Sequence, residues 1–189
     1  MIRLRHVSAG YPEKKVLRDI SLTLPETGAA AVMAPSGYGK TTLLRVLAGL
    51  IRISAGEISG LEGRKIAFLF QEDRLLPWLT AEKNVEIVSD GDTARRWLRA
   101  MEIEDISQRP HDMSGGMQRR VALARALAFR GDILLLDEPF KGLDEALKER
   151  IAAKIKNAAP LIVLSVHDQK EAALLDAKII QLDQLEQES

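Results

Sequence analysis

The sequence of 189 residues contains no cysteine. This absence excludes disulfide bonds, thiolate metal sites and a cysteine nucleophile. It also fits a reducing compartment, in which disulfide-stapled proteins are rare. Any chemistry in this chain must therefore come from oxygen and nitrogen groups of the side chains and the main chain.

The sequence also lacks an excess of charge and any long apolar run. Lys and Arg together number 27, as do Asp and Glu, so no overall field draws the chain to nucleic acid or to an anionic membrane. The longest apolar stretches, such as AAAVMA and ILLL, are far shorter than the ~18 residues of a membrane-spanning helix. The N-terminal segment has no apolar core of signal-peptide length. We expect a soluble protein that reaches a membrane only by binding a partner.

The alternation of strand-like and helix-like segments predicts an α/β fold with a parallel sheet. The length fits one domain with an inserted helical lobe, and no internal repeat is present. Strands are expected within 2–24 and over 29–34, 66–70, 133–136, 161–166 and 179–180. Helices are expected over 40–50, 115–129 and 144–157, and the segment 80–106 is expected to be mainly helical.

A glycine-rich segment over 34–41, with the sequence APSGYGKT, follows an expected strand and opens an expected helix. Main-chain N–H groups in such a loop bind phosphate, and the helix N-terminus adds partial positive charge. Lys40 would reach the β- and γ-phosphates and Thr41 would ligate Mg²⁺. Ala34 stands where the usual pattern has glycine, which is tolerable at negative φ and harmful at positive φ. The alternative is an ordinary glycine-rich turn before a helix.

Two acids, Asp137 and Glu138, end the apolar run over 133–136. In open α/β sheets, ligands bind at this carboxyl edge. Asp137 would hold Mg²⁺ through its water shell, and Glu138 would act as general base on an attacking water. Taken alone, the pair fits equally well two surface acids at the end of a strand.

Four further polar features are weaker when each is taken alone. His167 and Gln71 each follow an expected strand, but a lone residue of either type there is more often structural. Tyr11 lies in an expected turn, where an exposed ring could also stack on adenine. Ser114 is followed by two glycines and would cap a helix, which is either a simple cap or a second anion site.

The ordered set of these features resembles the ABC transporter ATPase family over nearly the whole chain. The order is Tyr11, the phosphate loop, Gln71 of the Q-loop, the signature over 114–116, the acidic pair, the D-loop over 142–144 and the switch residue His167. The resemblance implies a P-loop NTPase fold: a RecA-like parallel-sheet core, an N-terminal antiparallel β subdomain and an inserted helical subdomain. It further implies a single ABC ATPase domain over 1–189, with core and β subdomain over 1–75 and 130–189 and helical subdomain over about 76–129. Few positions follow His167, and we expect no regulatory domain there.

The resemblance also implies ATP and Mg²⁺ as cofactors and a head-to-tail dimer, homodimeric or with a paired cassette. Two ATP molecules would lie between the phosphate loop of one copy and the signature of the other. The residues that it assigns to nucleotide binding are Tyr11, Ser36, Gly37, Tyr38, Gly39, Lys40, Thr41, Thr42, Ser114, Gly115, Gly116 and Asp144. Those that it assigns to catalysis are Glu138, His167 and Gln71, and those near the metal are Thr41, Gln71 and Asp137.

The sequence departs from the family pattern in three places besides these matches. Ala34 replaces the first loop glycine, Met113 replaces the commoner leucine, and Lys141-Gly142 replaces a small pair before Leu143-Asp144. Only the change at Ala34 puts the geometry of the nucleotide loop in question.

The segments 70–79 and 111–118 look like those of cassettes for nitrate, sulfonate and taurine uptake. The resemblance therefore implies the ATPase of an importer for a small anion or organic solute. Its partners would be transmembrane permease subunits and an extracellular substrate-binding protein, with no nucleic acid. It would be cytoplasmic, peripheral on the inner face of the membrane. The apolar residues over 75–78 are expected either to pack within the helical lobe or to receive the permease.

Two other functions compete with this interpretation. A soluble ABC ATPase acting on DNA needs a long coiled coil between Gln71 and Ser114, and a ribosome-associated one needs two cassettes; the chain offers neither. The departure at Ala34 suggests a second alternative, a cassette that binds ATP without hydrolysing it. The presence of Glu138 and His167 argues against this alternative. Measured ATP turnover would distinguish a transporter ATPase from a cassette that does not hydrolyse ATP. Co-purification with a membrane protein rather than with nucleic acid would distinguish it from a DNA- or ribosome-associated ATPase.

Overall fold

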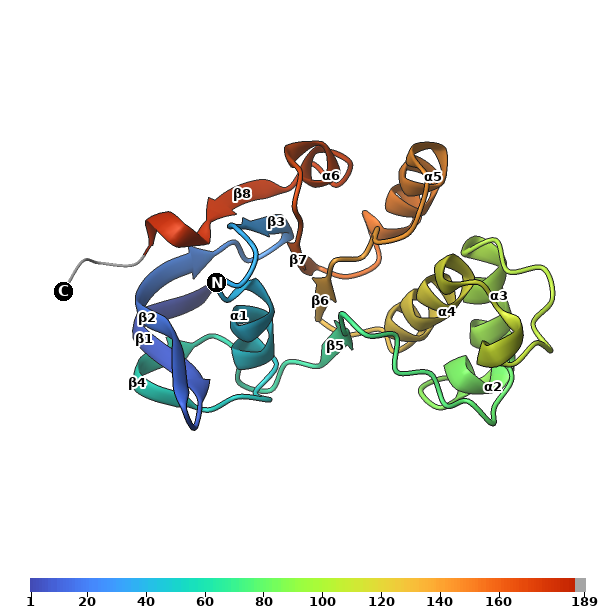
Figure 1. Ribbon diagram of the computed structural model, residues 1–189, viewed down its shortest axis with the longest axis horizontal. Helices are drawn as coiled ribbons and strands as arrows, with labels where there is room; N and C mark the ends of the chain where they lie inside the picture. The colour runs from blue at the N-terminus through green and yellow to red at the C-terminus, as the bar shows by residue number, and fades with distance from the viewer. Residues whose placement is uncertain (186–189) are drawn as a thin grey trace.

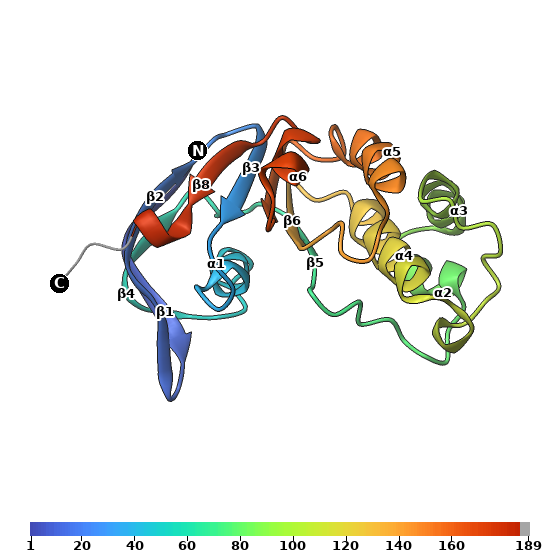
Figure 2. The same ribbon diagram turned by 45° about the horizontal axis from the view of Figure 1, so that its top comes forward.

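The computed structural model describes residues 1–185, so only the last four positions of the predicted domain lie outside it. Two sheets organise the chain (Figures 1 and 2). The strands β1 (Ile2–Tyr11), β2 (Lys14–Leu24) and β4 (Ile53–Ser59) form an antiparallel sheet in the order β2-β1-β4. The strands β3 (Gly28–Met33), β5 (Ile66–Leu69), β6 (Ile133–Asp137), β7 (Leu161–Ser165) and β8 (Lys178–Gln181) form a parallel sheet in the order β5-β6-β7-β3-β8. The predicted α/β architecture is confirmed.

The central strands are apolar along their whole length because both faces of the parallel sheet are covered. Every residue of β6 and β7 is buried. Along β6, Leu134 and Leu136 enter one apolar cluster, whereas Ile133 and Leu135 enter another. The first cluster also contains residues of the helices α4 (Gly115–Ala128) and α5 (Glu145–Ile155), and the second contains α1 (Lys40–Leu47) and the antiparallel sheet. The sheet therefore separates two hydrophobic cores.

A helical lobe lies beside the β5 edge of the parallel sheet, on the side away from α1 (Figure 1). It contains α2 (Ala81–Glu86), α3 (Gly91–Ala100), the short 3-10 helix η1 (Pro110–Asp112) and α4. The helices α2, α3 and α4 pack against one another. Two short elements, α6 (Gln169–Ala173) and the 3-10 helix η2 (Leu182–Gln184), flank β8.

The helical expectation over 80–106 is only partly right, because this segment divides into α2 and α3. The Asp90 side chain accepts a hydrogen bond from the Thr93 main-chain N–H and so starts a new helix at Gly91. The strand β4 was not predicted, since most of its residues are exposed and show no apolar alternation. The helix α6, capped by Asp168, was also missed.

The buried side chain of Asn84 holds the part of the β5–α2 loop that lies next to α2. Its Oδ1 accepts from the Leu76 main-chain N–H at 2.8 Å, and its Nδ2 donates to the Leu76, Leu79 and Thr80 carbonyls at 3.0–3.2 Å. Because Asn84 is fully buried, no water can replace these bonds once they are lost.

Replacing Asn84 with alanine should therefore lower the free energy of unfolding by about 2–4 kcal/mol, from a buried unpaired N–H and a small cavity. Urea unfolding measures this loss. The exposed Asn157 offers a matched control, and Asn157→Ala should change stability by less than about 0.5 kcal/mol. Equal effects of the two substitutions would contradict this account of the loop.

Candidate functional site

A pocket of about 330 Å³ opens beside the loop that joins β3 to α1. Gly37 and Gly39 of this loop have φ of 83° and 101°, which favours glycine. A Cβ on Gly39 would also lie 2.9 Å from side-chain atoms of Val16 and Leu17. The φ of Ala34 is not positive, so its methyl group is tolerated. The pocket is lined by Tyr11, Lys14, Val16, Ser36, Gly37, Gly39, Lys40, Thr41, Thr42, Gln71, Glu138 and His167.

Lys40, the first residue of α1, brings a buried positive charge to this pocket, which Lys14 also lines. Its residue is only 6% exposed, and its Nζ donates to the Ala34 carbonyl at 2.7 Å, with a longer contact to the Pro35 carbonyl at 3.4 Å. The loop carbonyls thus hold a buried ammonium group that has no carboxylate partner among residues 1–185. An anion entering the pocket would supply the missing charge.

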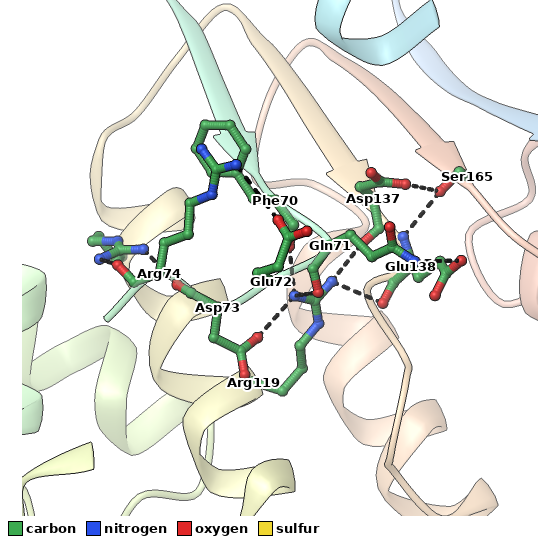
Figure 3. Close-up of polar contacts among 10 residues, drawn as sticks. Phe70, Gln71, Glu72, Asp73, Arg74, Arg119, Asp137, Glu138 and Ser165 are labelled. Carbon is green, nitrogen blue, oxygen red and sulfur yellow. Dashed lines mark hydrogen bonds and ion pairs between the residues drawn. The ribbon is translucent and has the colours of Figure 1, made fainter. Parts of the chain in front are cut away.

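Asp137 ends β6 beside the pocket and is 1% exposed. Its Oδ1 accepts from Ser165 Oγ at 2.6 Å (Figure 3). Its Oδ2 is buried and has no hydrogen-bond partner within residues 1–185. A buried carboxylate oxygen without a partner is costly, and a cation or its water shell would satisfy it.

Glu138 lies at the centre of a polar group at the same edge. Its Oε1 lies 2.7 Å from His167 Nε2 and 3.4 Å from Gln71 Nε2. Burial raises the pKa of the Glu138 carboxyl, but the hydrogen bond and charge of His167, with smaller contributions from Lys141 and Gln71, lower this pKa by more. The carboxylate is therefore ionised at neutral pH, as a general base must be.

Tyr11 reaches the pocket from the antiparallel sheet. The residue is 45% exposed, and its hydroxyl accepts a hydrogen bond from Arg45 Nη1 at 2.9 Å. Arg45 lies on α1, so this bond ties the ring to the helix that the phosphate loop opens. Tyr38 does not line the pocket; its side chain is exposed on the loop instead.

The signature residues lie elsewhere, at the start of α4 in the helical lobe. Ser114 caps this helix, with its Oγ accepting from the Met117 main-chain N–H at 3.2 Å. Ser114 and Gly115 are exposed, whereas Gly116 is half-buried. A second hollow of about 280 Å³ lies beside this tip and is lined by Gln71, Glu72, Asp73, Gly115, Gly116, Arg119, Lys141 and Gly142. Asp144 is exposed and caps α5 through the Leu147 N–H at 2.9 Å.

The structure thus gathers the phosphate loop, Tyr11, Gln71, Glu138 and His167 around one pocket, with Asp137 next to it. It leaves Ser114, Gly115, Gly116 and Asp144 outside that pocket. Both ribbon views show α1 and α4 on opposite sides of β5 and β6. Four polar residues of this region were missed: Lys14, Arg45, Ser165 and Arg119. None of them carries a sequence signal, because each acts through contacts with distant parts of the chain.

Within residues 1–185, no helix combines the length and apolar character needed to cross a membrane. The same residues contain no cluster of three or more His, Asp or Glu side chains that could hold a metal ion by themselves.

Comparisons with known proteins point in one direction. The family model described as "ABC transporter" matches residues 17–141. An aliphatic sulfonates import ATP-binding protein of Pseudomonas savastanoi pv. phaseolicola is 36% identical over 190 residues, covering 95% of this chain and 79% of that protein. An Fe(3+) ions import ATP-binding protein of Yersinia pestis bv. Antiqua is 37% identical over 197 residues, covering 90% of this chain and 56% of that protein.

The fold has equally clear counterparts among solved structures. A dimeric ATP-binding cassette in a post-hydrolysis state, bound to ADP and Pi, superposes with a TM-score of 0.83 at 29% identity. The match covers 92% of this chain and 91% of that one.

The lowered pKa of Glu138 predicts a pH-dependent contribution to stability. A carboxyl whose pKa is lower in the folded than in the unfolded state stabilises the fold above its unfolded pKa, and this contribution is lost as the pH falls through the folded pKa. The free energy of unfolding of the unmodified protein should therefore fall, relative to that of Glu138→Gln, as the pH is lowered through and below the ordinary pKa of a glutamate carboxyl, about 4.3.

Urea unfolding over this pH range measures the difference. Since His167 is the main group that lowers this pKa, the same comparison in a His167→Ala background should show a smaller fall. A difference that is independent of pH, or that is unchanged by His167→Ala, would contradict the assignment.

Proposed function

The chain belongs to the ABC transporter family and is an ATPase of that family; from this premise we propose that it drives an importer as one of two cassettes closing on ATP. Two copies, or this chain and a paired cassette, would meet head to tail. The observation that carries the proposal is the exposed signature tip, which lies outside the pocket of its own chain. A second copy can bring its own signature tip to that pocket, which the tip of the first copy does not reach.

In this proposal the pocket binds ATP. Main-chain N–H groups over 36–42 surround the phosphates, and Lys40 exchanges its loop carbonyls for the β- and γ-phosphate oxygens. The exposed Tyr11 ring, tethered by Arg45, stacks on adenine. Tyr38 is exposed on the loop and would contribute its main-chain N–H rather than its side chain; this N–H donates to the Pro35 carbonyl at 3.3 Å and would turn to the phosphates when ATP binds.

The residues beside the pocket fit Mg²⁺. Thr41 and Gln71 line the pocket, and the unpartnered Oδ2 of Asp137 offers a buried carboxylate oxygen next to it. Oxygen ligands of this kind are those that Mg²⁺ prefers. Bound there, the metal would neutralise charge on the phosphates. Ser165 fixes Asp137 by holding its other oxygen.

Glu138 acts as the general base of hydrolysis. Its ionised carboxylate accepts the proton of the attacking water. Gln71 contacts this carboxylate, and His167 holds it from the other side until ATP binds. When ATP is bound, His167 turns from Glu138 toward the γ-phosphate. Half of the His167 side chain is exposed, which leaves room for this change.

The second anion site of the sandwich is the tip of α4. The free N–H groups over 115–116 and the helix dipole favour a γ-phosphate presented by the other copy. Asp144 lies exposed near the same surface and would contact the partner cassette. The helical lobe, over about 76–129, would act as one subdomain that carries the tip.

To drive transport, the cassette must bind permease subunits, and we place this contact on the helical lobe. Trp78 is 66% exposed although its neighbour Leu75 packs on the core, so the segment 75–78 presents apolar surface. We assign this surface to permease subunits, which would place the chain in the cytoplasm on the inner face of the membrane. The similarity to sulfonate cassettes favours a sulfonate or a related small anion, with nitrate and taurine in the same class, delivered by an extracellular binding protein.

Replacing the base should separate binding from hydrolysis. Glu138→Gln should lower ATP turnover at least about 100-fold, because a neutral amide cannot accept the proton. The same variant should accumulate as a dimer with ATP and Mg²⁺, measured by size-exclusion chromatography. A variant that hydrolyses ATP normally would remove Glu138 from its role, and one that stays monomeric would contradict the sandwich.

A mixing experiment tests directly whether each site needs two chains. Lys40→Ala should weaken ATP binding, and Ser114→Arg should block the tip, so each variant alone should be inactive. In a head-to-tail dimer of the two variants, one site carries both substitutions and the other carries neither. An equal mixture should therefore regain about a quarter of normal turnover, since half of the random dimers are mixed and each has one intact site.

The control places both substitutions in one chain. Mixed with unmodified protein, the double variant forms heterodimers without an intact site, so those dimers should be inactive. If mixing the two single variants restores no turnover although mixed dimers form, each site belongs to one chain and the proposal fails.

A further inference from the structure

A buried arginine joins the signature helix to the catalytic edge of the sheet. Arg119 lies on α4, five positions after Ser114, and is 3% exposed. Its guanidinium group lies between the segment after β5 and the end of β6 (Figure 3). One side chain therefore contacts two loops that are far apart in the sequence.

On the β6 side, Arg119 holds both peptide groups that flank the Cα of Glu138. Its Nη2 donates to the Asp137 carbonyl and to the Glu138 carbonyl, the latter at 2.9 Å. Ser165 Oγ accepts from the Glu138 N–H at 3.0 Å, which fixes the first of these peptide groups from its other end. The next residue, Pro139, has no N–H, so the carbonyl is the only polar group by which the second peptide can be held.

This grip explains an unusual backbone conformation. Glu138 has a φ of 51°, in the left-handed region that residues with a Cβ rarely adopt. Such a conformation costs free energy and persists only where surrounding contacts enforce it. Arg119 and Ser165 supply those contacts, and they thereby set the direction in which the Glu138 side chain leaves the main chain.

On the β5 side, the same guanidinium holds the segment that carries Gln71. Its Nη1 donates to the Phe70 carbonyl at 2.7 Å, with a longer contact to the Gln71 carbonyl at 3.5 Å. It also donates to Asp73 Oδ1 at 2.9 Å, so its buried charge is paired. With both segments held by Arg119, Gln71 Nε2 lies 3.4 Å from Glu138 Oε1, to which it donates a long hydrogen bond.

We propose that Arg119 is a positioning residue that holds Gln71 and Glu138 in register with each other and with the signature helix. The proposal rests on the roles proposed above for Gln71 and Glu138. A guanidinium group suits this task because its N–H donors lie in one rigid plane, so that it can donate hydrogen bonds to both loops at once. Lysine would retain the charge beside Asp73 but has a single nitrogen with no fixed geometry.

The neighbouring Arg120 shows that the arrangement is specific to Arg119. Arg120 also donates to two main-chain carbonyls, those of Met101 and Glu102, at 2.8 and 2.7 Å. Those residues lie after α3 in the helical lobe and do not line the ATP pocket. Arg120 therefore provides a matched control: the same side chain, on the same helix, with the same kind of partners.

Steady-state ATP turnover by Arg119→Lys and Arg119→Gln tests the proposal. We expect kcat to fall about 10- to 100-fold, the size of effect that follows a misplacement of catalytic groups by about 1 Å. The KM for ATP should change less than about threefold, because Arg119 does not line the pocket. Arg120→Gln should leave both constants close to normal.

A second readout separates positioning from loss of structure. In a Glu138→Gln background, adding Arg119→Lys should leave the ATP-bound dimer intact, since neither the phosphate loop nor the Ser114 cap contacts Arg119. If thermal unfolding shows that Arg119→Gln does not fold, the kcat of Arg119→Lys alone tests the proposal. A normal kcat in Arg119→Lys, or equal losses in Arg119→Lys and Arg120→Gln, would overturn the proposal.

The same experiments distinguish its failure from failure of the proposed function. If Glu138→Gln retains turnover, the proposed role of Glu138 is wrong and the positioning role falls with it. If Glu138→Gln is inactive while both Arg119 variants turn over ATP normally, only the inference about Arg119 is wrong.

Discussion

The parallel register of the five-stranded sheet is the constraint on which the site depends. Leu69 pairs with Leu136, Leu136 with Leu164, and Val32 with Ser165, so the four neighbouring strands end at nearly the same level. The residues that follow them therefore emerge at one edge. Gln71 comes two positions after Leu69, and Glu138 two positions after Leu136, which is why a glutamine and a glutamate far apart in the chain meet there. Hydrophobic burial on both faces of the sheet fixes this register, because a slip by one residue would turn every side chain to the opposite core.

The parts of this architecture that sequence could predict are those whose residues are buried. The strands β6 and β7 read as continuous apolar runs because both faces are covered, and the phosphate loop shows its glycines directly. Exposed or short elements left no such pattern, as β4 and α6 show. The interruption between α2 and α3 depended on a single capping aspartate inside a segment that is otherwise amphipathic. Ala34 shows a different limit. From the sequence we could infer that alanine fits this position only if its φ is negative, but the structure was needed to show that its φ is not positive.

Arg119 shows most clearly what sequence reasoning could not find. An arginine next to another arginine on a helix normally indicates a solvated face. Here one of the two is buried, and its partners are mostly main-chain carbonyls of the segments after β5 and β6. A carbonyl has no residue identity, so no motif could have indicated the contact. The left-handed φ of Glu138 was hidden for the same reason: it is imposed by those contacts and not by the residue type.

The position of Arg119 also limits how the helical lobe can move. The Arg119 guanidinium is 3% exposed and its partner Asp73 is 22% exposed, so separating them while Arg119 stays buried would leave a charge without its partner, which is unfavourable. A lobe motion that pulled α4 away from the sheet would incur this cost and release Gln71 and Glu138 together. A motion that kept the contact would instead carry both loops with the helix. Since Gln71 lines both the ATP pocket and the hollow beside the signature tip, either motion changes the pocket and this hollow of one chain at the same time. Coupling between the signature helix and Glu138 therefore requires no long chain of contacts, because the Arg119 side chain joins α4 directly to the main chain of Asp137 and Glu138.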